Sequence, residues 1–353
     1  MKRQTTPLAF LVLLLGLALS TLIAAALGES SLDLVDALTR PESQAHAILF
    51  ELRLPKIALA ALVGAALGIA GAALQALLKN PLADPFILGV SGGAAFGATL
   101  SLALGATALG LTLSQPCQRL PGRLEGLCAA VLQGSPTTLL ALLFALLSTA
   151  VVYGAARHRG RMSPLRALLA GVVFNALASA AITFVKVLSP PDRLGELTSW
   201  LTGSLGYPQP GALLALALFE GIAFAIIGWH AHGLNLLALG DRSAGLLGLD
   251  VERARCILFV ALSLLVAAAV SVSGMIGFVG LIVPHLLRLW MGADQKRLLP
   301  ASALLGASFL ILADLAARRL LPMLGTAPPV GALTALIGAP FFLGLLKRGH
   351  EED

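Results

Sequence analysis

The chain has 353 residues, of which 58% are hydrophobic and 12% are charged, and its mean hydropathy is +0.90. Soluble domains carry about twice that share of charged residues, so the composition excludes an ordinary soluble domain. The net charge of +6 does not indicate nucleic-acid binding, because the basic residues lie in short clusters between apolar runs and aromatic residues make up only 5% of the chain. We therefore expect an all-α, polytopic membrane protein.

Ten apolar segments follow one another along the chain, most of them near the length of about 20 residues that crosses a bilayer. They cover approximately residues 7–28, 54–78, 90–112, 136–156, 165–188, 211–230, 255–273, 276–290, 299–318 and 330–346. The segments at 255–273 and 276–290 are either one kinked helix or two short helices. No separate soluble domain is evident, so we expect a single transmembrane domain over residues 1–353.

The first apolar segment follows two basic residues, Lys2 and Arg3, as the core of a signal peptide does. Its apolar stretch exceeds the usual signal-peptide core of about 7–15 residues, which favours a retained membrane helix. With the N-terminus in the cytoplasm, the inner segments hold 15 of the 24 Lys and Arg residues and the outer segments hold 8. The positive-inside rule then predicts that both termini are cytoplasmic.

Small residues and proline predict how these helices pack. Gly64 and Gly68, like Gly93 and Gly97, have the four-residue spacing that lets helix backbones approach closely. Pro284 lies inside an apolar segment and is expected to break or kink its helix.

Four stretches in a fixed order go beyond general membrane-protein character. They contain Arg53-Leu-Pro-Lys56 with Asn80-Pro-Leu-Ala-Asp84-Pro85, then Leu239-Gly-Asp241, then Gly280-Leu-Ile-Val-Pro284-His285, and finally Ala313-Asp314-Leu-Ala-Ala-Arg318. Together they resemble the FecCD family of ABC importer permeases, which includes permeases for ferric siderophores, haem and cobalamin. The resemblance covers nearly the whole chain.

The resemblance implies a bacterial inner-membrane subunit of ten helices, paired with a second copy or a close paralogue around a central pathway. It also implies two ATP-binding subunits on the cytoplasmic side and a periplasmic or lipid-anchored substrate-binding protein outside. The expected cargo is an iron chelate, with a ferric siderophore first, then haem or cobalamin.

The loop at about 236–252 lies on the cytoplasmic side by charge count and is too polar to span a membrane. Its apolar residues have helical spacing, so it could form a short amphipathic helix that fits a groove on a partner. The resemblance implies that this is the coupling helix to the ATPase, carried by Asp241, Ala244, Leu247 and Gly248. The alternative is a solvated connector.

The chain itself carries no ATPase motif. A phosphate-binding loop needs Gly-Lys-Ser/Thr, and no lysine here follows a glycine. We therefore expect a transport subunit that is not an enzyme and has no cofactor of its own, with ATP and Mg bound by the partner. The six histidines do not have the spacing of a metal site, so no metal is expected either.

Three basic residues, Arg53, Lys56 and Arg318, fall at helix ends on the predicted outer side. The resemblance implies that they pair with acidic residues of the binding protein, where opposite charges fix the register of docking. The alternative is that their side chains reach lipid headgroups. In the outer loop, Cys117 and Cys128 are ten residues apart and could form a disulfide in an oxidising periplasm.

Polar residues interrupt the apolar sequence near the inner face. The resemblance implies that Asn80 and Leu82 narrow the cytoplasmic end of the pathway, and that Ser163, Pro164 and Leu165 form a second constriction. The chain departs from the family there, with Pro and Leu where small hydroxyl residues can occur.

Glu220 lies in the middle of an apolar segment, where a charge is costly and a functional role is the first hypothesis. It is either a pathway residue or a structural one. The rival function is a proton-coupled secondary transporter with Glu220 as its proton site, which would need no partner ATPase.

Overall fold

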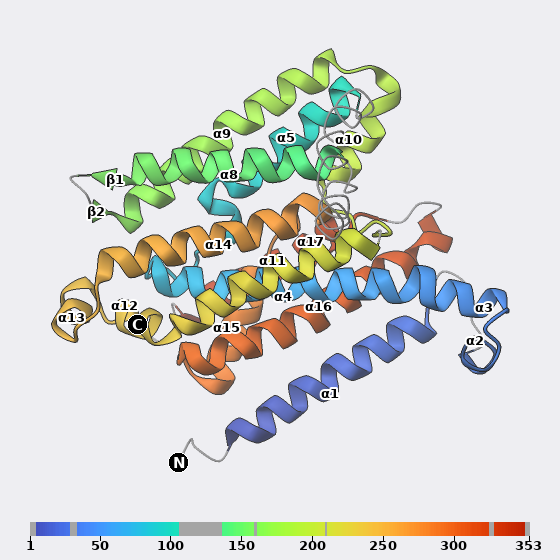
Figure 1. The fold of residues 1–353 in the computed structure, drawn as a ribbon, viewed down its shortest axis with the longest axis horizontal. Coiled ribbons are helices and arrows are strands. Elements are labelled where there is room, and N and C mark those ends of the chain that lie inside the picture. The colour runs from blue at the N-terminus through green and yellow to red at the C-terminus, as the bar shows by residue number, and fades with distance from the viewer. Residues whose placement is uncertain are drawn as a thin grey trace, which may run out of the picture.

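The computed structural model describes residues 5–28, 34–105, 136–158, 161–208, 210–324 and 328–349. Within these ranges the chain is helical almost throughout, and the predicted all-α membrane fold is confirmed (Figure 1). Cys117 and Cys128 lie outside the described residues.

Seven of the described helices are long and apolar enough to cross a membrane. They are α1 (Thr5–Ala26), α4 (Leu54–Leu77), α8 (Pro136–Ala156), α9 (Pro164–Leu188), α11 (Pro210–Trp229), α14 (Val251–Ser273) and α16 (Gln295–Leu324). Three shorter apolar helical stretches are α5 (Val90–Leu104), α15 (Val279–Met291) and the Val330–Phe342 part of α17 (Val330–Gly349). Together they account for all ten predicted segments.

Short elements join these helices. They are α2 (Leu34–Thr39), α3 (Gln44–Ala47), η1 (Ile48–Arg53), η2 (Pro85–Leu88), η4 (Pro191–Arg193), α10 (Leu194–Leu201), α12 (Ala231–Ala238), α13 (Asp241–Leu246) and the antiparallel pair β1 (Arg157–His158) and β2 (Arg161–Met162). Figure 1 shows α12, α13 and the β1–β2 pair at one end of the long axis and α2, α3 and α10 at the other. We call these the α13 end and the α10 end.

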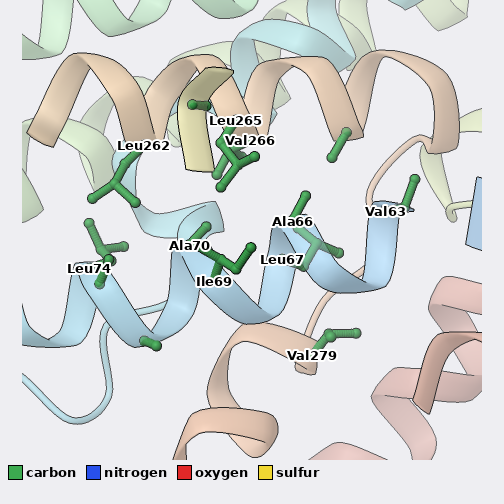
Figure 2. Close-up of a cluster of buried hydrophobic side chains, with 14 of the residues drawn as sticks. Val63, Ala66, Leu67, Ile69, Ala70, Leu74, Leu262, Leu265, Val266 and Val279 are labelled. Atoms are coloured by element: carbon green, nitrogen blue, oxygen red, sulfur yellow. The ribbon is translucent and has the colours of Figure 1, made fainter. Parts of the chain in front are cut away.

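Helix α4 is the centre of the core and is packed on several sides by α11, α14, α15 and α16. Figure 2 shows apolar side chains of α4 and α14 pointing toward one another, with Leu74 facing Leu262. The sequence of α4 is apolar all round because almost every face of this helix is covered by protein. By contrast, only 17% of the α9 span is buried, so its apolar side chains face outward.

The predicted glycine packing is confirmed. A Cβ on Gly64 would collide with the carbonyl of Gly306, and one on Gly68 would collide with the carbonyl of Ser302, both in α16. Gly93 and Gly97 likewise let α5 approach the backbone of α8. These contacts require glycine because any side chain would hold the helices apart.

The 255–290 region forms two helices and not one kinked helix. Helix α14 ends at Ser273, and the chain turns through Gly274 and Phe278, both with positive φ, before α15 begins. Helix α15 continues through Pro284, where a break or kink was predicted. The break lies upstream of this proline, between α14 and α15. The glycine can adopt this left-handed conformation without steric cost, and its Cα lies against the backbone of Trp200.

Candidate functional site

Helix α13 is a short helix held by one buried residue. Gly240, with φ of 115°, turns the chain into the helix, and Gly248, with φ of 87°, turns it out again. Ala244 is fully buried and faces the protein, whereas Leu246 is 82% exposed and Leu239 and Leu247 are also exposed. The predicted loop is therefore a helix that presents leucines away from the subunit, as a docking element would.

Asp241, the first residue of α13, accepts contacts from two cations through the same oxygen. Its Oδ1 lies 2.6 Å from Nζ of Lys79, just beyond the end of α4, and 2.7 Å from Nη2 of Arg255, in the first turns of α14. Partial burial acts to raise the pKa of Asp241, but the hydrogen bonds from Arg255 and Lys79 outweigh it and hold that pKa below its ordinary value. Asp241 is therefore the ionised link between α13, α4 and α14.

Arg255 carries this link further. Its side chain is only 2% exposed, and its Nη1 donates to the carbonyl of Met162 at 3.0 Å. The backbone N–H of Met162 in turn donates to Oε1 of Glu252 at 2.7 Å. The end of β2 is thus tied on both sides to the start of α14.

Both segments predicted as constrictions follow directly on these contacts. Lys79 precedes Asn80, whose Oδ1 accepts the N–H of Leu82 at 2.9 Å and closes a tight turn. Met162 precedes Ser163, which leads into Pro164 as the first residue of α9. Both Leu82 and Leu165 are exposed. Their role as constrictions remains a prediction, but the structure places each segment one residue beyond a contact of the Asp241 network.

At the α10 end, the basic residues predicted to dock a binding protein lie inside the subunit and not on an exposed rim. The guanidinium of Arg53 donates to the carbonyls of Ala25 and Ala26 at 2.8 and 3.2 Å. Lys56 and Arg318 are both buried beside Asp314, with N–O distances of 3.9 and 2.8 Å. The Nζ of Lys56 also lies 4.7 Å from the ring centre of Tyr207. The direct docking role remains a prediction, and these charges are engaged within the chain.

Asp314 is the residue of this cluster to which the sequence analysis assigned no role. It is 2% exposed and lies four residues before Arg318 on α16. That i,i+4 spacing of acid and base in a helix was the available signal, since such residues share one face. Its contact with Lys56 joins α16 to α4, and spacing along the chain could not predict it.

Glu220 lies on the buried face of α11 with Leu216, Ala223 and Ile227. Among the described residues, its Oε1 has no hydrogen-bond partner. The ion pairs found among the described residues do not include Glu220. The geometry therefore does not decide between a pathway role and a structural role.

Comparison with known proteins matches residues 11–348 to the FecCD transport family. The hemin transport system permease protein HmuU of Yersinia pestis is 37% identical over 351 residues, covering 96% of this chain and 97% of the relative. The vitamin B12 import system permease protein BtuC of Vibrio cholerae is 39% identical over 342 residues, covering 96% and 94%.

A solved structure is also similar to this chain in three dimensions. It is an inward-facing conformation of a transporter described as of the metal-chelate ABC type, with a TM-score of 0.78 and 30% sequence identity. The alignment covers 97% of this chain and 99% of that one.

Proposed function

Because this chain belongs to the FecCD transport family and is a permease subunit of an ABC importer, we propose that a separate pair of ATP-binding subunits drives it and that a periplasmic or lipid-anchored binding protein delivers its cargo. The observation that carries the first part is α13, whose Ala244 is buried while Leu246 and Leu247 are exposed. An amphipathic helix with an uncovered apolar face is suited to a groove on a partner protein.

The orientation follows from charge. The α13 end carries Lys79, Arg255 and other basic residues that the sequence places on the inner side, and we propose that this end faces the cytoplasm. Helix α1 starts toward this end in Figure 1. Helix α17 begins at the α10 end, with Gly331 against the carbonyl of Thr202, and runs back toward the α13 end. Both termini would then be cytoplasmic.

The proposed cargo is a metal chelate of low molecular weight. Its support is the names of the relatives, which transport hemin and vitamin B12, together with the metal-chelate type of the solved neighbour. Ferric siderophore, haem and cobalamin are the candidates, and the two named relatives favour the tetrapyrroles. The chain performs no covalent chemistry on any of them.

We propose that the pathway narrows at the α13 end. Asn80 and Leu82 would form one constriction there, and Ser163, Pro164 and Leu165 would form the second. The support is that both segments interrupt helices at the same end of the subunit, next to the contacts of Asp241. At the α10 end, we propose that the binding protein docks near Arg53, Lys56 and Arg318. The support is that basic side chains gather at this end, with Lys56 and Arg318 beside Asp314, and basic groups attract acidic side chains of a partner.

We further propose that the subunit works as a pair, with a second copy or a close paralogue. The outer helices α1, α9 and α11 are largely uncovered, and an exposed apolar face in a membrane subunit is available to lipid or to a partner helix.

Two measurements test this function together. Purification of the wild-type chain should recover an ATP-binding subunit encoded with it, and the purified binding protein should bind one of three probes: a ferric siderophore, haem or cyanocobalamin. ATP-dependent uptake of that probe into liposomes should require all three proteins. Uptake that persists without any ATP-binding subunit would contradict the proposal. The proton-coupled alternative has no support from the family, and Glu220→Gln tests it directly in the same assay.

A further inference from the structure

We propose that Asp241 is a positioning residue that links the coupling helix α13 to both constriction segments, through Lys79 to Asn80–Leu82 and through Arg255 to Ser163–Leu165. This inference rests on the proposed roles of α13 and of the two segments. Asp241 would then connect α13 physically to both segments.

The first step is the geometry at Asp241. One carboxylate oxygen accepts from Lys79 at 2.6 Å and from Arg255 at 2.7 Å, distances typical of charge-assisted hydrogen bonds. The two cations come from separate elements, one beyond the C-terminal end of α4 and the other in the first turns of α14. A displacement of Asp241 must therefore move both cations or break one of the contacts.

The second step is the route to the first constriction. Lys79 has φ of 52°, a left-handed conformation that is uncommon for a residue with a side chain. It is directly followed by Asn80, whose side chain closes the turn onto the N–H of Leu82. The ammonium held by Asp241 thus belongs to the residue that starts this turn.

The third step is the route to the second constriction. The buried guanidinium of Arg255 reaches from Asp241 on one side to the carbonyl of Met162 on the other, using two different nitrogens. A planar guanidinium holds two acceptors in fixed relative positions, which a lysine could not do. Since Met162 directly precedes Ser163, a shift of α13 is transmitted to the start of α9.

The ion pair between Asp241 and Lys79 is poorly suited to a purely structural role. Asp241 and Lys79 are both partly exposed, and ion pairs at an exposed surface add little to stability. The Asp241–Lys79 pair spans 162 residues of sequence, and together with the Asp241–Arg255 contact it joins α13 to α14 and to the end of α4, at the end of the molecule where α13 lies (Figure 1). We expect its removal to change transmission of movement more than folding.

The experiment uses the complete transporter in liposomes, with the permease, its ATP-binding subunits and its binding protein. A spin label is introduced as an unnatural amino acid at position 82 or 165, so the native cysteines are retained. The distance between the labels of the two permease copies is measured before and after trapping with ATP, Mg and vanadate. ATP hydrolysis and recovery of the ATP-binding subunits are measured on the same samples.

We expect Asp241→Asn to make the distance change at both labels at least about fivefold smaller in the samples that retain the ATP-binding subunits. Lys79→Gln should reduce the change at position 82 and spare position 165, which separates the two routes even if Asp241→Asn folds poorly. Asp294→Asn is the matched control, because Asp294 is a partly exposed aspartate whose polar contacts among the described residues are with Asn235, Lys296 and Arg297 and not with either segment.

Full distance changes at both labels in Asp241→Asn would overturn the inference and leave the proposed function intact. Loss of ATP-binding subunits from the wild type, or wild-type labels that do not move on trapping, would overturn the proposed function and the inference with it. Equal loss at both labels in Lys79→Gln would also contradict the two-route arrangement.

Discussion

Gly64 of α4 and Gly306 of α16 are in reciprocal backbone contact, since a Cβ on either residue would collide with the carbonyl oxygen of the other. This crossing lies in the core of the subunit, where α4 is covered on most sides. In a bilayer, lipid is as apolar as the helix surface, so close packing of small residues supplies much of the association of helices.

Gly306→Ala is therefore expected to destabilise the subunit by about 1–3 kcal/mol, because the added methyl must force the two backbones apart. The measurement is the midpoint of thermal unfolding in detergent. Gly154→Ala is the matched control, since a Cβ at that helical glycine meets nothing within 4 Å. A stability for Gly306→Ala equal to that of the control would contradict the close contact.

Asp314 is expected to be essential for stability at the α10 end. Asp314→Asn leaves the buried charges of Lys56 and Arg318 without their shared carboxylate, and removing one partner of a buried ion pair costs about 3–5 kcal/mol. Unfolding in detergent measures the loss.

The control for Asp314 is another helical acid with a base four residues later. Asp36 of α2 pairs at 3.3 Å with Arg40, just beyond the end of that helix, but the Arg40 side chain is 79% exposed. Asp36→Asn should change stability by no more than about 1 kcal/mol. Similar losses at both sites would show that burial is not the deciding factor.

Leu246 is expected to matter for assembly and not for folding. Leu246→Ser removes an apolar side chain that is already 82% exposed, so unfolding should be unchanged. If the leucine is an interface hot spot, the affinity for the ATP-binding subunits should fall by roughly 2 kcal/mol, about 30-fold. Binding of the purified ATP-binding subunits to the permease in nanodiscs measures this directly.

Leu38→Ser supplies the control for Leu246, because Leu38 is a similarly exposed leucine in α2 at the opposite end. Its affinity for the ATP-binding subunits should equal that of the wild type. Equal weakening by both substitutions would argue against docking on α13.

The contribution of Asp241 to stability should depend on pH in one direction. Its pKa is lower in the folded protein than in the unfolded chain, so its stabilising effect is present above the ordinary aspartate pKa and is lost as pH falls through the folded value. Because the carboxylate is partly exposed, the effect is expected to be no more than about 1 kcal/mol.

The measurement is the difference in unfolding midpoint between the wild type and Asp241→Asn. It should stay constant from about pH 8 to pH 5 and shrink below about pH 4. A difference that disappears between pH 7 and pH 6 would assign the effect to another group.

Glu220→Gln should transport at the wild-type rate, because an importer driven by ATP needs no proton site in α11. The amide keeps the shape of the side chain, so the substitution removes the acid and little else. ATP-dependent uptake into liposomes is the measurement, with and without an imposed proton gradient. Abolished uptake with unchanged ATP hydrolysis would place Glu220 in the pathway.

Much of the fold could be predicted from hydrophobicity along the chain. The segment at 136–156 coincides with α8, and the segment at 165–188 begins one residue after α9 does. The two segments at 255–273 and 276–290 are the separate helices α14 and α15, with the interruption at Gly274 and Phe278, and α15 does not end at Pro284. A proline within a helix removes one backbone hydrogen-bond donor, whereas the break lies where Gly274 approaches the carbonyl of Trp200 too closely for a side chain.

The site was predicted less completely. Asp241 and Ala244 were assigned to the coupling loop, and the structure gives them opposite environments, one partly exposed and ionised, the other fully buried. Asp314 was read only as part of a motif. The basic residues of the α10 end were expected to dock a partner and lie buried. The sequence does not show that Lys56 of α4 packs beside Asp314 of α16, or that Arg53 reaches backbone carbonyls at the end of α1.

By itself, the sequence determined where the membrane helices run, which end of each carries positive charge, and to which family the chain belongs. These properties depend on local hydrophobicity, on charge counts and on ordered motifs. Only the tertiary structure decided which charges meet. Lys79 and Asp241, or Lys56 and Asp314, become partners because helix packing brings distant residues within a few ångströms, and electrostatic interactions in a protein depend on that distance and on burial, not on separation along the chain.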